Sequence, residues 1–509
     1  PKSIVVVGGS DDIHKPGGTV LRNLQDGNFK GSLYVVNPKM DEVQGIKAYR
    51  DVKDLPEVDC AILAIAAKFC PSTVEVLAKQ KNTKAFVILS AGFHEENEEG
   101  AKLERQIVET INSVGGSLIG PNCIGVLTNH YSGVFTSPIP ELNPKGVDLI
   151  SGSGATALFI MDSGMQKGIK FNSMYSVGNS AQLGVEEILE YMDESFDPET
   201  SSRVKLLYVE SIENPEKLLK HASSLIRKGC RIAAVKSGGS AAGSRAASSH
   251  TGALASSDVA VEALFRKAGI VRCNGRDELM TVAGIFMHPE MKGRNMVVVT
   301  HAGGPAVMLT DALSNGGMDV PHIEGEKAQE LLGKLFAGSS VGNPIDFLAT
   351  GTAEQLGYIL DACDRDFDNI DGMAVIFGSP GLFPVFDVYN VLDEKMKTSK
   401  KPIFPIFPSS KIVKDEIADF VSKGRVYFPD EVLFGNALCK IYKTPAPQPE
   451  HFEMPDMDVK KIREVVDNAQ NGYLSPDEIH ALLDAAGVAR AKEGVSDNEE
   501  EIVRMAKEI

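Results

Sequence analysis

The sequence contains no tryptophan and only seven cysteines among 509 residues. The cysteines are widely spaced, odd in number and never arranged as CxxC, at positions 60, 70, 123, 230, 273, 363 and 439. Such spacing indicates neither a disulfide framework nor a zinc site. We therefore expect no metal held by the side chains of this chain.

Long apolar runs and positive charge are also scarce. The longest apolar stretches, such as "CAILAIAA" (60–67), are far short of the roughly 20 residues that a membrane-spanning helix needs, and no signal peptide opens the chain. With 52 lysines and arginines against 69 aspartates and glutamates, the formal charge is −17, which disfavours binding to nucleic acid or anionic lipid. We expect a cytoplasmic protein with no nucleic-acid or membrane partner.

Glycine is abundant: 48 glycines and 26 prolines in a chain that is 43% hydrophobic are typical of a folded protein rich in strand-to-helix turns. Short β-branched runs alternate with helical stretches at "SIVVVGG" (3–9), "SLYVVN" (32–37), "AFVILSAGF" (85–93) and "SLIGPNCIGV" (117–126). This alternation predicts a doubly wound parallel sheet whose ligand lies at the carboxyl ends of the strands.

The same alternation returns twice further along the chain. A second unit follows "PELNPKG" (140–146), a third begins near "NMVVVTHAGG" (295–304), and the proline-rich segment 443–458 is typical of an extended linker. Beyond it, "YLSPDEIHALLDAAGV" carries a capping box from Ser475 to Glu478, with Pro476 at the first helical position. We predict α/β domains at 1–130, 143–290 and 291–443, a linker at 444–458, and an incomplete domain at 459–509.

The turn after the first predicted strand holds Gly8, Gly9 and Ser10, where backbone N–H groups and a helix N-terminus can approach a phosphate. The spacing is not GxGxxG. Lys39, after the second strand, stands near the position where a nicotinamide-binding domain offers an acidic residue, and a cation there suits a phosphorylated nucleotide or CoA better. The alternative is a tight turn with a solvated lysine.

The stretch "ISGSGATA" lies between a predicted strand and a helix. The N–H groups of Ser153, Gly154 and Ala155 form a candidate anion nest at the helix start, with simple helix capping as the alternative. The pattern is echoed in "MVVVTHAGGPAVMLTDAL", which favours two similar α/β units related by duplication.

One histidine stands at the end of a run of small residues, "KSGGSAAGSRAASSHTGALASSD". We expect a loop over 237–249 that closes over a ligand or moves, with His250 just ahead of a helix beginning near residue 253. A neutral imidazole is a competent nucleophile towards phosphoryl groups, and Glu210, at the end of the neighbouring strand, could fix its tautomer. The alternatives are that His250 is a loop histidine hydrogen-bonded to backbone groups, and that Glu210 is a solvated carboxylate.

These features together resemble the NDP-forming acyl-CoA synthetases, also called ADP-forming acetyl-CoA synthetases, of the succinyl-CoA synthetase superfamily. The resemblance covers essentially the whole chain and rests on "VVVGGSDDIHKPGGTVLRNL", "VVNPK", "SAGF", "GPNCIGV", "ISGSGA", "VGNSA", "THAGGP", "SVGNPIDF" and, most specifically, the histidine block. It implies a Rossmann-like CoA-binding domain, then two flavodoxin-like domains like those of succinyl-CoA synthetase, then the start of an ATP-grasp domain.

The resemblance also implies roles for the candidate residues. His250 matches the phosphorylated histidine and Glu210 the carboxylate that supports it. Ser153, Gly154 and Ala155 match the helix start that receives the phosphate, and Cys123, in "GPNC", is taken as structural. The motifs that hold CoA contain Gly8, Gly9, Ser10, Lys15 and Lys39.

The implied reaction converts acyl-CoA, phosphate and ADP reversibly into acid, CoA and ATP, through an acyl phosphate and a phosphohistidine, with Mg²⁺ accompanying the nucleotide. Residues 459–509 look like only the opening of an ATP-grasp domain. We therefore expect a fragment of a longer polypeptide, or a chain that associates with an ATP-grasp subunit or a second copy of itself. Gly152 stands where relatives often carry a longer polar residue, which bears on acyl or phosphate selectivity.

Two other functions fit parts of the sequence. A non-catalytic acyl-CoA sensor, or the regulatory half of a protein acyltransferase, would share these domains, but the intact "SSHTGAL" favours the enzyme. A nicotinamide-dependent dehydrogenase is disfavoured by Lys39 and by the lack of GxGxxG.

Overall fold

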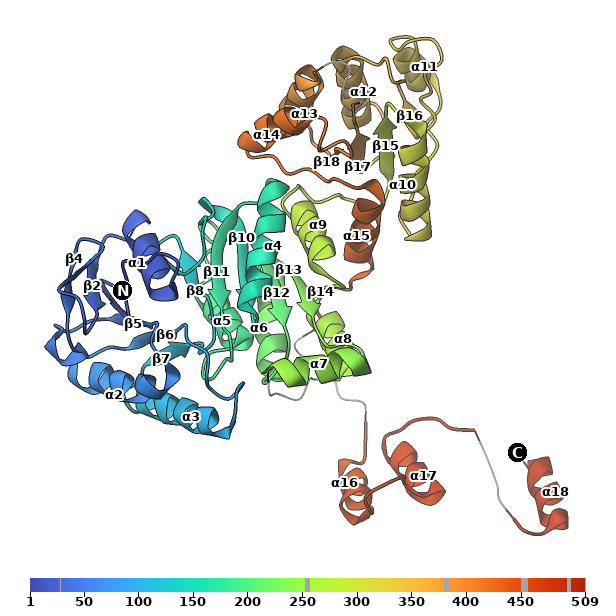
Figure 1. The fold of residues 1–509 in the computed structure, drawn as a ribbon. Coiled ribbons are helices and arrows are strands. Elements are labelled where there is room, and N and C mark those ends of the chain that lie inside the picture. Colours follow the sequence, from blue (N-terminus) through green and yellow to red (C-terminus); the bar gives the residue numbers. More distant parts are fainter. Residues whose placement is uncertain (28, 252–256, 380–383, 450–455, 492–495, 509) are drawn as a thin grey trace. The chain divides into compact units, whose positions relative to one another are not determined.

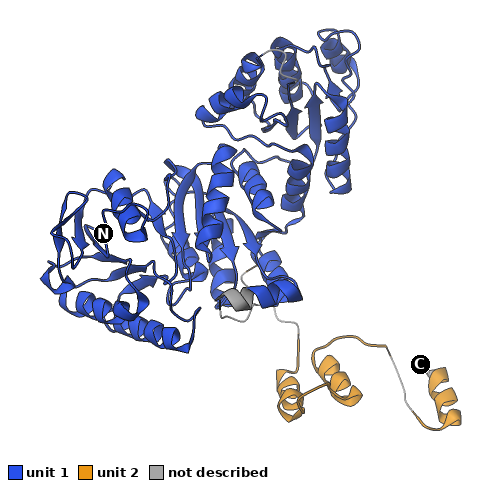
Figure 2. Cartoon of the chain, in the orientation of Figure 1, with its two compact units in different colours: residues 1–448 blue, residues 449–509 orange. Residues whose placement is uncertain are grey.

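The structure is a computed structural model that describes residues 1–509 except 28, 252–256, 380–383, 450–455, 492–495 and 509, and gives residues 247–251 and 508 by their backbone alone. The chain divides into two compact units, Pro1–Gln448 and Pro449–Ile509 (Figure 2). Three sheets flanked by helices make up the first unit (Figure 1). The predicted α/β fold is confirmed.

The first sheet is parallel except at one edge and has the strand order β3-β4-β2-β1-β5-β6-β7. Its strands are β1 (Ser3–Val7), β2 (Ser32–Val36), β3 (Glu42–Val43), β4 (Ile46–Tyr49), β5 (Cys60–Leu63), β6 (Ala85–Ile88) and β7 (Ser117–Ile119). Its helices are α1 (Pro16–Asp26), α2 (Cys70–Gln80) and α3 (Glu98–Ser113), with short 3₁₀ turns at Val52–Asp54 and Ala67–Phe69.

Alternation along β1 shows why helices cover both faces of this sheet. Ile4 and Val6 pack in one hydrophobic cluster with α1, whereas Val5 and Val7 pack in another with α2 and α3. Successive side chains of a strand point to opposite faces, so a continuous apolar run is stable only when both faces are covered. Figure 1 shows α1 on one side of the sheet and α2 with α3 on the other.

The second sheet has the order β14-β13-β12-β10-β11-β8-β9. Its strands are β8 (Gly125–Thr128), β9 (Tyr131–Val134), β10 (Leu142–Ser151), β11 (Phe171–Ser176), β12 (Val204–Val209), β13 (Arg231–Lys236) and β14 (Val271–Cys273). Its helices are α4 (Gly154–Gln166), α5 (Val185–Glu194), α6 (Pro215–Arg227), α7 (Ala241–Thr251), α8 (Asp258–Ala268) and α9 (Arg276–Phe286).

The segment "SLIGPNCIGV", expected as one strand, is divided between two sheets. β7 pairs with β6 in the first sheet, whereas β8 pairs antiparallel with β11 in the second. Gly120 (φ +94°) and Asn122 (φ +56°), between the two strands, and Gly125 (φ +105°), the first residue of β8, have positive φ, which interrupts the extended backbone. This stretch therefore carries the chain from one sheet to the next.

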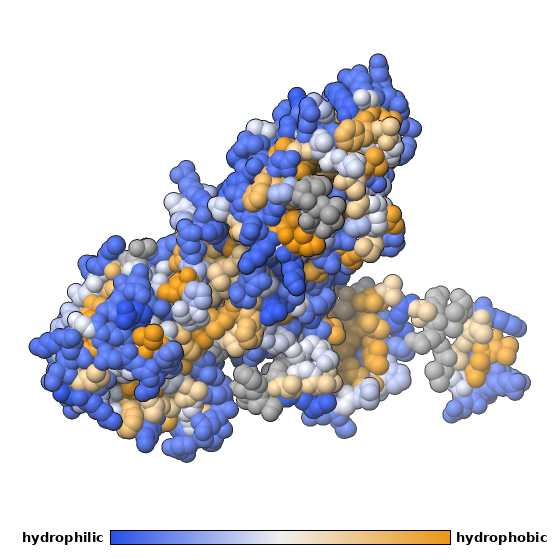
Figure 3. All heavy atoms as spheres, turned by 45° about the horizontal axis from the view of Figure 1, so that its top comes forward, coloured by the Kyte–Doolittle hydropathy of each residue, from blue (hydrophilic) through white to orange (hydrophobic). Residues whose placement is uncertain are grey.

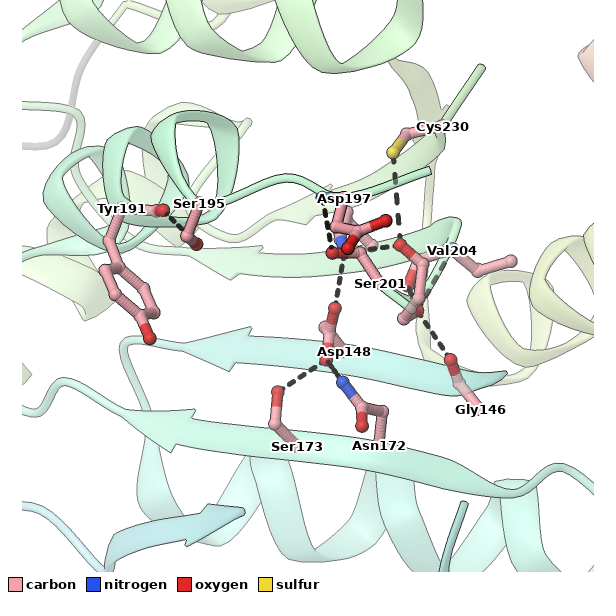
Figure 4. A network of polar contacts seen from close by, with 12 residues as sticks. Gly146, Asp148, Asn172, Ser173, Tyr191, Ser195, Asp197, Ser201, Val204 and Cys230 are labelled. Atoms are coloured by element: carbon pink, nitrogen blue, oxygen red, sulfur yellow. Dashed lines mark hydrogen bonds and ion pairs between the residues drawn. The ribbon is translucent and has the colours of Figure 1, made fainter. Parts of the chain in front are cut away.

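A buried polar network ties the central strands of the second sheet together (Figure 4). The Lys205 ammonium lies 2.5 Å from the Asp148 carboxylate, and both side chains are less than 5% exposed. Asp148 also accepts hydrogen bonds from Ser173 (2.6 Å) and Asn172 (2.7 Å), while Lys205 donates to the Ser202 carbonyl (2.8 Å). The network therefore joins β10, β11 and β12 without leaving either buried charge unpaired.

The third sheet is parallel, with the order β16-β15-β17-β18. Its strands are β15 (Met296–Thr300), β16 (Ile345–Asp346), β17 (Gly372–Ile376) and β18 (Ile403–Ile406). Its helices are α10 (Gly303–Asn315), α11 (Glu326–Leu332), α12 (Ala353–Arg365), α13 (Phe386–Thr398), α14 (Lys414–Ser422) and α15 (Glu431–Lys443). One hydrophobic cluster includes Leu149 of the second sheet, Met280 of α9 and Phe404 of β18, so the two sheets share a core.

The small-residue loop expected over 237–249 is wrong from residue 241 onwards, because 241–251 form helix α7. The Ser240 hydroxyl accepts a hydrogen bond from the Gly243 N–H (3.0 Å) and so caps the helix, and the alanines that follow have the highest helix propensity. His250 lies in the last turn of α7, and its side chain is outside the described structure. Among the described residues, the next helix, α8, begins at Asp258; residue 253, where the sequence predicted a helix start, lies outside them.

The second unit contains α16 (Val459–Asn468), α17 (Pro476–Ala485) and α18 (Glu499–Glu508), with α16 packed against α17. The predicted capping box is confirmed: Ser475 accepts from the Glu478 N–H (3.3 Å), and Glu478 accepts from the Ser475 N–H (2.7 Å). Pro476 occupies the first turn of α17, as expected.

Hydrophilic residues cover most of the face drawn in Figure 3, and the apolar residues among them gather in small groups. Among the described residues, no helix is long and apolar enough to cross a bilayer. All seven cysteines are buried free thiols.

Candidate active site

The first predicted site, after β1, is a turn that only glycine fits. Gly8 has φ +90°, and a Cβ there would lie 2.5 Å from the Ala64 carbonyl oxygen. A Cβ on Gly17, in the first turn of α1, would lie 2.1 Å from the Gly8 carbonyl oxygen. The helix start is therefore pressed against the turn, and this close approach is possible only because both positions are glycine.

The other residues predicted at this site surround the same turn. The Ser10 hydroxyl accepts from the Asp12 N–H (3.1 Å), Lys15 precedes α1 with a 68% exposed side chain, and Lys39 follows β2. Asn37, which the sequence analysis did not single out, joins the turns by donating from its amide to the Gly9 carbonyl (2.9 Å). The structure thus brings the predicted CoA residues to one edge of the first sheet.

Backbone contacts connect this edge with the second sheet. The Ser90 hydroxyl donates to the Ile65 carbonyl, and the Asn122 N–H donates to the Ser90 carbonyl (2.9 Å). The Asn179 N–H then donates to the Pro121 carbonyl (2.9 Å). The loops after β5, β6 and β7 therefore form a continuous rim from the Gly8 turn to the loop after β11.

The second predicted site is the start of α4, where Ser153 is the N-cap. The Ser153 N–H donates to the Ser151 hydroxyl (3.2 Å), and the Ser153 hydroxyl accepts from the Thr156 N–H (3.4 Å). Of the three predicted donors, Ser153 thus has a partner within the turn. Gly154 and Ala155 occupy first-turn positions, whose N–H groups have no intrahelical acceptor.

The echoed segment in the third sheet has the same turn. The Ala302 N–H donates to the Thr300 hydroxyl (3.0 Å), which donates to the Ala302 carbonyl (2.8 Å), and α10 follows at once. The first copy has the corresponding pair between Ser151 and Ser153 (2.7 and 3.2 Å). The sequence echo is therefore also a structural one.

A cavity of about 440 Å³ lies where the carboxyl ends of the first and second sheets meet. The first sheet contributes His94, after β6, and Asn122, after β7. The second contributes Gly152, Asn179 and Glu210, which follow β10, β11 and β12. Ligands of parallel α/β sheets bind outside the carboxyl ends of the strands, so this cavity is the strongest candidate for the reaction site.

Of the predicted residues, Glu210 lines this cavity and Gly152 places the start of α4 beside it. The CoA residues around Gly8 lie further along the rim and do not line it. Glu210 is half-buried and accepts a long hydrogen bond from the Tyr208 hydroxyl (3.4 Å). The position of the His250 imidazole relative to Glu210 lies outside the described structure.

Sequence reasoning missed a network of side chains in the cavity wall. The Asn179 amide donates to Glu95 (2.5 Å) and to Glu104 (3.1 Å) and accepts from Asn122 (3.3 Å). His94 Nδ1 lies 2.7 Å from Glu104 Oε1. Burial pushes the pKa of Glu95 upward, but hydrogen bonds from Asn179 and backbone N–H groups outweigh it and hold that pKa below its ordinary value. The motifs "SAGF", "GPNCIGV" and "VGNSA" were the signals in the sequence that pointed to these loops.

Cys123, close to the same rim, is 3% exposed, and its thiol donates to the Ile88 carbonyl (3.3 Å). Burial raises the pKa of Cys123 to about 12, so it remains a thiol at physiological pH. It therefore packs the rim and supplies no nucleophile.

Two family models match the chain. Residues 2–129 match the CoA binding domain, and residues 144–286 match the succinyl-CoA ligase like flavodoxin domain. The chain is 31% identical to acetate–CoA ligase [ADP-forming] I of Archaeoglobus fulgidus, over 100% of this chain and 73% of that protein. It is 35% identical to acetate–CoA ligase [ADP-forming] II subunit alpha of Pyrococcus furiosus, over 80% of this chain and 88% of that subunit.

A solved structure has the same fold. It is the dinucleotide forming acetyl-coenzyme A synthetase 1 of Ca. Korarchaeum cryptofilum in complex with phosphate and ADP, which superposes with a TM-score of 0.77 at 27% identity, over 87% of this chain and 95% of that one. The residues quoted for the resemblance, the two domain matches and these relatives agree, and the chain belongs to the ADP-forming acyl-CoA synthetases, a family of acid–thiol ligases.

Proposed function

We propose that the chain carries out the acyl-CoA half of a reversible reaction in which acyl-CoA, phosphate and ADP give acid, CoA and ATP. A phosphate oxygen attacks the thioester carbon, the C–S bond breaks, and CoA leaves as a thiolate that takes up a proton. The product is an acyl phosphate. The Gly154 and Ala155 N–H groups at the start of α4, together with the helix dipole, bind the phosphate in this step.

The phosphoryl group then moves to His250. An imidazole nitrogen attacks phosphorus, the bond from phosphorus to the acyl oxygen breaks, and the free acid leaves as its carboxylate. Glu210 supports this step by accepting a hydrogen bond from the other ring nitrogen, which fixes the tautomer and stabilises the positive imidazole. The place of Glu210 in the wall of the cavity, beside the start of α4, supports these roles.

CoA occupies the edge of the first sheet around Gly8, Gly9 and Ser10, with Lys15 and Lys39 beside its phosphates. The match of residues 2–129 to a CoA binding domain supports this assignment. The rim from the Gly8 turn to Asn179 gives the arm of CoA a path towards the cavity.

The nucleotide is bound by an ATP-grasp domain, of which residues 459–509 form the beginning or which a separate subunit carries. Two relatives named as alpha subunits support association with another chain, and a second copy of this chain is the other candidate partner. Mg²⁺ accompanies the nucleotide. Among the described residues no cluster of three metal-binding side chains occurs, and no step above uses a metal. Seven buried free thiols fit a reducing, cytoplasmic compartment.

The observation that carries the proposal is the cavity that brings Glu210 and the start of α4 together at the carboxyl ends of two sheets. The test is CoA thiol release from a panel of acyl-CoAs in the presence and absence of phosphate. We expect release that requires phosphate. Because Glu210 is assigned to the following step, we expect Glu210→Gln to slow the phosphorylation of His250 by acyl-CoA and labelled phosphate by about a hundredfold or more, while CoA affinity stays unchanged.

Glu216→Gln is the matched control, because Glu216 is exposed on α6 and lies outside the cavity. Full activity of Glu210→Gln would contradict the assigned role of Glu210. Tight CoA binding without thiol release from any acyl-CoA would favour an acyl-CoA sensor over the enzyme.

A further inference from the structure

Most of the side chains that line the 440 Å³ cavity are polar. Only Ala181, Val185 and Val209 contribute apolar side chains. Five carboxylates line it, Glu104, Glu186, Glu187, Glu210 and Glu213, and no lysine or arginine does so among the residues that the structure describes. A long aliphatic or aromatic acyl group would lose its hydration here without gaining apolar contacts.

The amide donors of the wall are engaged within the protein. Asn179 donates to Glu95 and Glu104. Gln182 donates to Asn112 (2.6 Å) and to the Gly116 carbonyl (3.2 Å) and accepts from the Leu118 N–H. These bonds fix the orientation of both amides, because turning either amide over would point its NH₂ group at a donor and its oxygen at an acceptor.

The acceptors of the wall are held in place but are not saturated. Glu104 pairs with His94, and Glu187 accepts from Lys217 (3.0 Å) and from the Gly184 N–H (2.8 Å). A carboxylate has about four acceptor positions, so each can accept a further hydrogen bond. Glu186 is 4% exposed and accepts from two backbone N–H groups, and burial raises its pKa. The cavity therefore offers ordered acceptors to a ligand.

The cavity also borders the proposed reacting groups. Gly152 directly precedes the N-cap of α4, and Glu210 is the proposed partner of His250. An acyl carbon within reach of a phosphate at the start of α4 must place its substituents in the adjoining space. That space is this cavity.

We propose that the cavity is the acyl subsite and that it selects short acyl groups carrying a hydroxyl, against unsubstituted and dicarboxylic acyl groups of the same length. This inference rests on the proposed function. A hydroxyl donates to the wall carboxylates, a methyl group leaves them without a partner, and a second carboxylate is repelled by them.

The test compares four-carbon thioesters that differ in one substituent: 3-hydroxybutyryl-CoA, 4-hydroxybutyryl-CoA, butyryl-CoA and succinyl-CoA. Phosphate-dependent thiol release by the full chain gives kcat/KM for each. We expect kcat/KM for the better hydroxyacyl substrate to exceed kcat/KM for butyryl-CoA and for succinyl-CoA by about tenfold or more. Hydrogen bonds to charged groups are stronger than hydrogen bonds between neutral groups. Equal or higher values for butyryl-CoA or succinyl-CoA would overturn the inference.

Glu104→Gln isolates one wall charge with little change of shape. The glutamine oxygen can still accept from Asn179, and its amide can donate to His94 Nδ1 once the imidazole adopts the other tautomer. We expect the preference for hydroxyacyl over succinyl substrate to fall by about tenfold. The matched control, Glu109→Gln, removes an exposed charge from the same helix outside the cavity and should leave the preference unchanged. An unchanged preference in Glu104→Gln would also overturn the inference.

Failure of this inference and failure of the proposed function are distinguishable. Thiol release from none of the thioesters, with CoA bound normally in calorimetry, would refute the enzymatic function. Thiol release without the expected order of substrates would refute only the selectivity.

Discussion

The turn at Gly8 offers a quantitative test of how the CoA edge is built. Gly8→Ala places a Cβ at φ +90°, 2.5 Å from the Ala64 carbonyl oxygen and 2.9 Å from Ile65 Cγ2. Left-handed backbone costs an alanine roughly 1–2 kcal/mol, and overpacking against neighbours that cannot move adds about 1–3 kcal/mol. Because one neighbour is backbone at the end of β5, the chain must move to relieve the contact. We expect Gly8→Ala to lower the free energy of unfolding by about 2–5 kcal/mol in total.

Gly45 supplies the matched control. It has φ +77°, and a Cβ there meets no atom of the described residues within 4 Å, so Gly45→Ala has the backbone cost alone. Isothermal titration with CoA and urea unfolding of both variants separate the two contributions. We expect Gly8→Ala to bind CoA at least about tenfold more weakly, and Gly45→Ala to bind it like the wild type. Wild-type CoA affinity in Gly8→Ala, with a stability equal to that of Gly45→Ala, would refute the reasoning.

Three further predictions address stability and the cavity. Lys205→Met leaves Asp148 buried without its cation and should lower the free energy of unfolding by about 3–5 kcal/mol in urea titrations, whereas adding Asp148→Leu should restore most of it. Burial lowers the pKa of His288 to about 4, so the unfolded chain binds more protons than the folded chain between pH 4 and 6.5. The free energy of unfolding should therefore fall as the pH drops from 6.5 to 4. In His288→Phe it should fall less. Gly152→Ala, whose Cβ has its nearest contact at 3.7 Å, should keep its stability within about 0.5 kcal/mol but alter relative kcat/KM values among acyl-CoAs.

The fold could be predicted wherever local pattern and tertiary structure agree. The apolar run of β1, the capping box at Ser475 and the strand–turn–helix at Ser153 follow from side-chain period, capping chemistry and turn geometry. Each depends on residues within one or two turns of each other. For this reason the sequence alone was enough to predict these three features.

The misses have two physical origins: a local pattern that fits two structures, and contacts that form only in the tertiary fold. Helix α7 was expected as a loop because its residues are small, yet alanines and a capping serine stabilise a helix equally well. "SLIGPNCIGV" was expected as one strand because its pairing with two different sheets is a tertiary property. The network that joins His94, Glu104 and Asn179 links residues up to 85 positions apart, and no local signal marks such partners.

The central claim is that His250 becomes phosphorylated. The phosphoryl group comes from inorganic phosphate, and the cleavage of an acyl-CoA thioester drives the transfer. The direct measurement is peptide mapping of the chain after incubation with labelled phosphate and a reactive acyl-CoA, under conditions that preserve acid-labile phosphohistidine. The account predicts label on the peptide containing His250 only when both substrates are present, and its loss in His250→Asn, which still binds CoA. Label at another residue, or thioester-dependent thiol release with an unlabelled His250, would contradict it.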